Sequence, residues 1–92
     1  MTDGPYVPRV AGSAARMIGR KLPEHVAAAV VGFITGGLLA NPHRAGKPLK
    51  RELEGLYAAR RGAFRILYEI DDNERRVTVI RVEHRADAYR PR

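Results

Sequence analysis

The chain has 92 residues, 45% hydrophobic and 29% charged, which predicts one folded domain over residues 1–92 and excludes a disordered protein. It has no cysteine, which excludes disulfides and thiolate metal sites and fits a reducing cytoplasm, and no apolar run reaches the roughly 18 residues of a membrane span. Seventeen Lys and Arg against ten Asp and Glu give a net charge of +7, which indicates a polyanionic partner such as nucleic acid or an acidic protein.

The N-terminal residues predict a short strand and then a helix. Residues 6–10 favour a strand, and Pro8 places it at a sheet edge because proline cannot donate a backbone hydrogen bond. Ser13 is the expected N-cap of a helix that runs to about Arg20.

A second helix is expected to complete a helical hairpin. Pro23 opens it at a first-turn position, where proline is tolerated, and the Asn41–Pro42 pair ends it. Apolar residues three or four positions apart form the face expected to enter the core, among them Val26, Val30, Phe33 and Ile34.

The second half of the chain predicts a basic loop followed by three strands. Residues 42–54 are polar and rich in turn formers, with room for one helical turn. The strands are expected at about residues 55–61, 64–71 and 76–83. The order β-α-α-β-β-β predicts an α+β domain with the helical hairpin on one face of a small, mostly antiparallel sheet.

Alternation along the last two strands separates an apolar face from a basic one. The residues expected to pack under the second helix are Phe64, Ile66, Tyr68, Ile70, Ile80 and Val82. A meander would bring four arginines together on the other face, and they repel one another unless they bind an anion: Arg60, Arg65, Arg81 and Arg85. The alternative is a solvated face on which Glu69 and Glu83 form the ion pairs.

No residue pattern predicts a metal or another cofactor. The three histidines, at 25, 43 and 84, do not have the spacing of metal ligands. Ser13 and Thr35 lack the context of a catalytic triad.

Two long stretches carry a resemblance to a known family. "NPHRAGKPLKRELEGLYAARRGAFRILYEID", followed by "VTVIRVEHRADAYR", resembles the RelE branch of the RelE/ParE superfamily, the toxins of bacterial toxin–antitoxin pairs. The resemblance implies a ribosome-dependent endoribonuclease that needs no metal. In that reaction a 2′-hydroxyl of the mRNA attacks the adjacent phosphate, which leaves a cyclic phosphate and a free 5′-hydroxyl.

The resemblance also implies roles for individual residues. Arg65 and Arg85 fall on the arginines that contact the scissile phosphate, and Tyr89 falls near the tyrosine that stacks on a base or helps proton transfer. The basic residues expected along the RNA backbone are Lys47, Lys50, Arg60, Arg61 and Arg81. Where the best-studied member has lysines, this chain has Leu56 and Ala58. Other basic residues could substitute for them, namely Arg60, Arg61, Lys47 or Lys50, but none is an easy general base at neutral pH. Tyr89 or His84 would therefore have to accept the proton.

Two other functions stay open at this point. A ParE-like member would act by binding DNA gyrase without nuclease chemistry, and a decayed toxin would only bind nucleic acid or an antitoxin. All three readings imply an acidic, RelB-like antitoxin as partner, and the first adds the ribosome and its mRNA. A surface of charge +7 suits fast, salt-sensitive association with such an acidic chain.

Overall fold

A computed structural model describes residues 5–84 as five strands and a set of short helices. The strands are β1 (Val7–Val10), β2 (Lys47–Pro48), β3 (Tyr57–Arg61), β4 (Phe64–Asp71) and β5 (Arg76–His84). They form one sheet in the order β1-β5-β4-β3-β2, with β1 parallel to β5 and every other pair antiparallel. The α+β prediction is confirmed, as is the edge position of the strand that contains Pro8.

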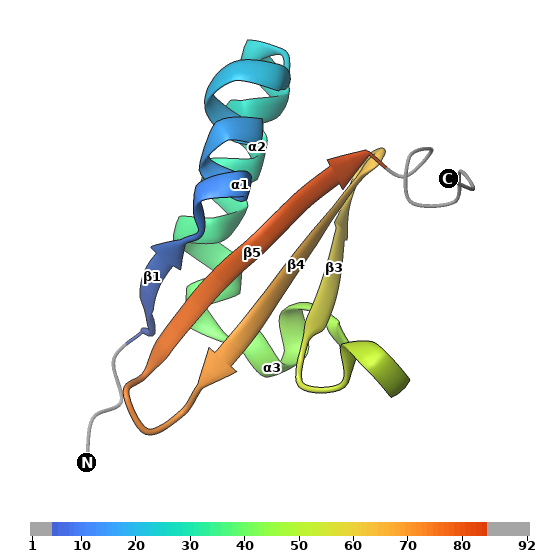
Figure 1. Cartoon of the computed structure of the whole chain (residues 1–92). Coiled ribbons are helices and arrows are strands. Elements are labelled where there is room, and N and C mark those ends of the chain that lie inside the picture. The colour runs from blue at the N-terminus through green and yellow to red at the C-terminus, as the bar shows by residue number, and fades with distance from the viewer. Residues whose placement is uncertain (1–4, 85–92) are drawn as a thin grey trace.

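The predicted helical hairpin lies on one side of this sheet (Figure 1). Its first arm is α1 (Gly12–Arg16), which widens into the π-helical segment η1 (Met17–Lys21). Its second arm is α2 (Glu24–Phe33), continued by the π-helical segment η2 (Ile34–Leu38). The predicted basic loop holds the short helix α3 (Pro42–Ala45), β2 and the 3-10 turn η3 (Arg51–Leu53). No helix within residues 5–84 is both long and apolar enough to cross a membrane.

The first helix begins differently from the prediction. Ala11, not Ser13, is its N-cap residue, and no side chain caps the helix. The Ser13 hydroxyl instead donates to the backbone carbonyl of Ile80 at 3.0 Å. Ser13 therefore ties α1 to the middle of β5.

The core lies between the hairpin and the sheet. Val30, Phe33 and Ile34 supply the helical side, as predicted, and Ile66, Tyr68 and Val82 supply part of the sheet side. Val26 and Ile70 are partly buried and pack against this cluster.

A β-bulge corrects one core prediction. Leu67 pairs with Arg81 and Tyr68 pairs with Val79, so Ile80 is the extra residue of β5. The bulge reverses the alternation beyond this point, which places Val79 and Val77, both fully buried, under the helices. Ile80 was predicted in the core, but it is only half-buried and lies outside the core cluster.

Phe64 also differs from the prediction. It is half-buried at the start of β4 and does not belong to the core cluster. Its ring meets the ring of His84 edge to face, with the centroids 5.0 Å apart.

Candidate nucleic-acid interface

Cross-strand pairing aligns basic residues in two rows on the sheet face opposite the helices. Ile66 and Tyr68 point into the core, so Arg65 and Leu67 point to the open face. The cross-strand partners of Arg65 and Leu67 form two rows across the sheet: Arg60–Arg65–Glu83, and Lys47–Ala58–Leu67–Arg81. We call this surface the open face.

Glu83 bridges two of the arginines on the open face. The Nε of Arg65 donates to one carboxylate oxygen of Glu83 at 3.0 Å, and its Nη2 contacts the same oxygen. The other oxygen lies 3.7 Å from an Nη1 of Arg81. The Glu83 side chain is 16% exposed, against 32% for Arg65 and 63% for Arg81. Part of the charge predicted to repel is therefore neutralised within the protein.

A hollow of about 530 Å³ lies on the other side of Arg65. Because β2 is only two residues long, none of the described strands pairs with the β2 side of β3 beyond Ala58. The lining contains three cationic residues and no carboxylate: Ala45, Gly46, Lys47, Leu49, Ala58, Ala59, Arg60 and Arg65. A hollow with this charge attracts anions such as phosphate groups.

Gly46 allows β2 to approach β3 closely enough to place Lys47 at this hollow. A Cβ at position 46 would lie 2.5 Å from the carbonyl oxygen of Ala58 and 2.7 Å from the hydroxyl of Tyr68. That hydroxyl donates to the carbonyl of Pro42 at 2.7 Å, which holds α3 nearby. Any side chain at position 46 would force these groups apart.

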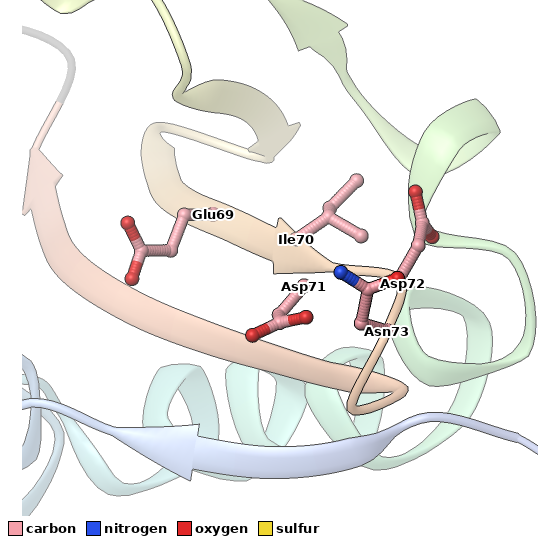
Figure 2. Close-up of a pocket in the computed structure, with 5 residues that line it drawn as sticks. All are labelled: Glu69, Ile70, Asp71, Asp72 and Asn73. Carbon is pink, nitrogen blue, oxygen red and sulfur yellow. The ribbon is translucent and has the colours of Figure 1, made fainter.

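A second hollow of about 530 Å³ has the opposite charge. It lies at the turn between β4 and β5 and is lined by Glu69, Ile70, Asp71, Asp72 and Asn73 (Figure 2). Three carboxylates line it, so it repels phosphate. Of these two hollows, the one beside Arg65 therefore has the charge that suits a phosphate group, and it is the candidate nucleic-acid site.

Arg61 and His84 lie on the helix side of the sheet. Arg61 pairs with Phe64, and its guanidinium carbon lies 3.8 Å from the centre of the Phe33 ring, a cation–π contact. His84 pairs with Phe64 from the other side. The structure therefore separates these two residues from Arg60 and Arg65.

The remaining predicted site residues fall elsewhere. Lys50 is exposed and directly precedes η3, and it does not line the hollow. Arg85 and Tyr89 lie outside the described residues. Lys47, Arg60 and Arg65 are thus the predicted residues that the structure brings together at one hollow, with Arg81 linked to them through Glu83.

A polar network that the sequence did not predict links the N-terminal strand to α3. The Asp72 carboxylate accepts a hydrogen bond from the Tyr6 hydroxyl, and Nε2 of His43 lies 3.0 and 3.1 Å from its two oxygens. Nδ1 of His43 lies 3.3 Å from the Tyr57 hydroxyl. The bonds from Tyr6 first, and then His43, lower the pKa of Asp72 below its ordinary value of 3.8. These residues are far apart in the sequence and meet only in the folded chain, so no sequence motif indicates the network.

Comparison with known proteins bears on the function of this surface. Residues 14–89 match the family described as "ParE toxin of type II toxin-antitoxin system, parDE". "Toxin RelE" of Mycobacterium tuberculosis is 51% identical over 88 residues, which cover 96% of this chain and 90% of that protein. "Toxin RelG" of the same organism is 51% identical over 86 residues, covering 94% and 98%.

Solved structures share the fold. The toxin–antitoxin complex RelBE2 of Mycobacterium tuberculosis contains a chain with a TM-score of 0.84 and 49% identity, over 89% of this chain and all of that one. The intact RelBE complex of E. coli gives a TM-score of 0.71 at 23% identity, over 86% of this chain and 95% of that one, a likeness of fold alone.

Proposed function

Because the chain belongs to the RelE/ParE superfamily of type II toxin–antitoxin toxins, we propose that it is a ribosome-dependent mRNA endonuclease that inhibits translation. The observation that carries the proposal is the hollow on the open face. Lys47, Arg60 and Arg65 converge there with no carboxylate in the lining. Three cations around one cavity suit the negatively charged backbone of an mRNA.

The proposed reaction uses the RNA as its own nucleophile. The 2′-hydroxyl attacks the adjacent phosphorus and gives its proton to a base, a new P–O2′ bond forms, the P–O5′ bond breaks, and the departing 5′-oxygen takes up a proton. The products are a 2′,3′-cyclic phosphate and a 5′-hydroxyl, so no metal is needed to supply a nucleophile. Negative charge accumulates on the pentacoordinate phosphorus, and the guanidinium of Arg65 would stabilise it. Arg85 is proposed to assist at the same phosphate.

Proton transfer is assigned to the C-terminal residues. Arginine stays protonated at neutral pH, so neither Arg60 nor Arg65 is suited to accept the proton of the 2′-hydroxyl. His84 packs against Phe64 on the helix side, which favours Tyr89 over His84 for this role. Lys47 is proposed as a fixed positive charge beside the phosphate, and Lys50 and Arg81 as contacts to the flanking RNA.

An acidic antitoxin of the RelB type is the proposed protein partner. Solved structures similar to this chain include complexes of RelE with RelB. The net charge of +7 favours association with a chain of opposite charge. The proposed site of action is the cytoplasm, where ribosomes and mRNA are found.

Primer extension on programmed ribosomes tests the proposal. Purified protein is added to 70S ribosomes that hold a defined mRNA with a vacant decoding site, and the same mRNA without ribosomes is the control. Cuts within the exposed codon that require the ribosome are the expected result. An intact message at stoichiometric protein would contradict the nuclease function.

A gyrase inhibitor is the second candidate, and the name of the matching family favours it. The description of that family names the ParE toxin, and a ParE-like member would act by binding DNA gyrase. Expression in cells separates the two functions, because gyrase poisoning induces DNA damage whereas mRNA cleavage stops protein synthesis first. A growth arrest with DNA damage and intact mRNA would favour this candidate.

A further inference from the structure

The Glu83 carboxylate occupies the position of an anion between two arginines. One of its oxygens accepts from Nε and Nη2 of Arg65, and the other faces Nη1 of Arg81 at 3.7 Å. A phosphate with two free oxygens would bind the same guanidinium edge of Arg65, with one oxygen at each of the two donors that now share a single oxygen of Glu83. The two anions therefore compete for one set of donors.

We propose that Glu83 is a built-in competitor that holds Arg65 until an RNA phosphate displaces it. The inference rests on the proposed function, because it concerns the phosphate that Arg65 would bind. It adds a control on RNA affinity: an RNA that also contacts Lys47 and Arg60 repays the loss of the Arg65–Glu83 pair, whereas an anion that contacts Arg65 alone does not. Arg65 is then available only for a phosphate held in place by other contacts.

The surroundings of Arg65 make this exchange possible. Lys47 and Arg60 line the hollow on the side of Arg65 away from Glu83, so a phosphate arriving there meets two further cations. The Arg65 side chain is 32% exposed and can turn from Glu83 toward the hollow without leaving the surface. Glu83 keeps Arg81 as a partner after the exchange.

A purely structural role for the pair predicts a different outcome. Glu83→Gln removes the charge and keeps the size of the side chain, so we expect the variant to fold, and circular dichroism checks this. If Glu83 only oriented Arg65, its removal would weaken RNA binding, because the guanidinium would no longer be held in place. If Glu83 competes, its removal strengthens RNA binding. The sign of the change distinguishes the two roles.

Glu83→Gln is the test variant, and Glu69→Gln is its matched control. Glu69 lies on the same strand face as Arg65 but four residues along β4, a separation of about 13 Å. Both substitutions raise the net charge by one on the open face, and only one of them frees Arg65. The difference in RNA affinity between the two variants therefore excludes the general effect of a more positive surface.

Binding of a fluorescein-labelled 12-nucleotide RNA is measured by anisotropy at fixed salt. The expected result is a Kd about tenfold lower for Glu83→Gln than for Glu69→Gln. The reason is that RNA no longer has to break a charge-assisted hydrogen bond of Arg65 before it binds. The gain should vanish when Arg65→Ala is added. Equal affinity of the two Gln variants, or weaker binding by Glu83→Gln, would overturn the proposal.

The unmodified protein gives an independent measurement. The Nε–H NMR resonance of Arg65 should move when the RNA displaces Glu83, and a resonance that stays in place at RNA saturation would overturn the proposal even if Glu83→Gln failed to fold. Neither experiment measures cleavage. If ribosome-bound mRNA stays intact but Glu83→Gln binds RNA tenfold more tightly, the nuclease function is rejected and the competition by Glu83 stands. If the mRNA is cleaved but Glu83→Gln binds no more tightly, the nuclease function stands and the competition is rejected.

Discussion

Lys47 lies directly opposite Ala58 in the pairing of β2 with β3, in the row next to the one that contains Arg65. Position 58 is one of the two at which the resemblance to the RelE toxins implies a lysine. Opposed residues of antiparallel strands have Cβ atoms about 5 Å apart, so the Lys47 side chain begins close to Ala58, and both residues line the same hollow. The short strand β2 thus supplies a lysine directly opposite position 58, where β3 has alanine.

Replacing Lys47 tests whether this neighbouring lysine takes part in the reaction. Lys47→Ala should lower single-turnover cleavage of ribosome-bound mRNA at least about tenfold, because one charge beside the phosphate is lost. Lys50→Ala removes the same charge three residues away, outside the hollow, and should cost much less. Equal losses in the two variants would show that Lys47 contributes only to general RNA attraction.

Gly46→Ala tests the close approach of β2 to β3. The new methyl group would lie 2.5 Å from the Ala58 carbonyl oxygen, so the backbone must move. We expect a loss of about 1–3 kcal/mol in the free energy of unfolding. Gly32→Ala, in α2, meets nothing within 4 Å and should be neutral or slightly stabilising. Urea unfolding of both variants provides the comparison.

Phe33 links the hydrophobic core to Arg61. Its ring is 7% exposed and lies beneath the Arg61 guanidinium. Phe33→Ala should therefore lower the free energy of unfolding by about 3–5 kcal/mol, a large share of the total for a domain of this size. Val31→Ala, at a position 44% exposed on the same helix, is the control. Similar melting temperatures for the two variants would contradict the assigned helix face.

Asp72 predicts a pH dependence of stability. Its hydrogen bonds from Tyr6 and His43 depress the folded-state pKa below the ordinary 3.8. A depressed carboxyl pKa stabilises the fold above the unfolded-state pKa, and this stabilisation disappears as the pH falls through the folded-state pKa. Asp72→Asn should therefore melt below the wild type at pH 6, with the difference shrinking below about pH 4. A constant difference across this range would show that the Asp72 charge is not involved.

Much of the fold could be predicted because it rests on local patterns. Alternation from Phe64 to Asp71 gave the bounds of β4, and the Asn41–Pro42 pair gave the end of the second helical arm. The bulge at Ile80 was not predicted, because it is set by the pairing of β5 with β4 and leaves no mark in residue type. One extra residue was enough to exchange Ile80 for Val79 in the core.

The site was predictable to a smaller extent. Arg60 and Arg61 are adjacent in a strand, so only one can reach the open face, and the pairing of Arg60 with Arg65 decides which. The closeness of Lys47 to Ala58 depends on Gly46 and a two-residue strand. Ion pairing by Glu83 on a solvated face was the alternative to an anion-binding face, and its bridge between Arg65 and Arg81 depends on the register of β4 with β5.

The most direct test of the account is single-turnover cleavage of ribosome-bound mRNA by the Arg65→Ala variant. Arg20→Ala, which removes an exposed arginine from η1, is the control for charge alone. If Arg65 stabilises the charge that develops on the phosphorus, Arg65→Ala should cleave about 10²-fold more slowly or worse, while ribosome binding changes much less and circular dichroism stays native. Cleavage at the wild-type rate by a folded Arg65→Ala protein would contradict the proposed site.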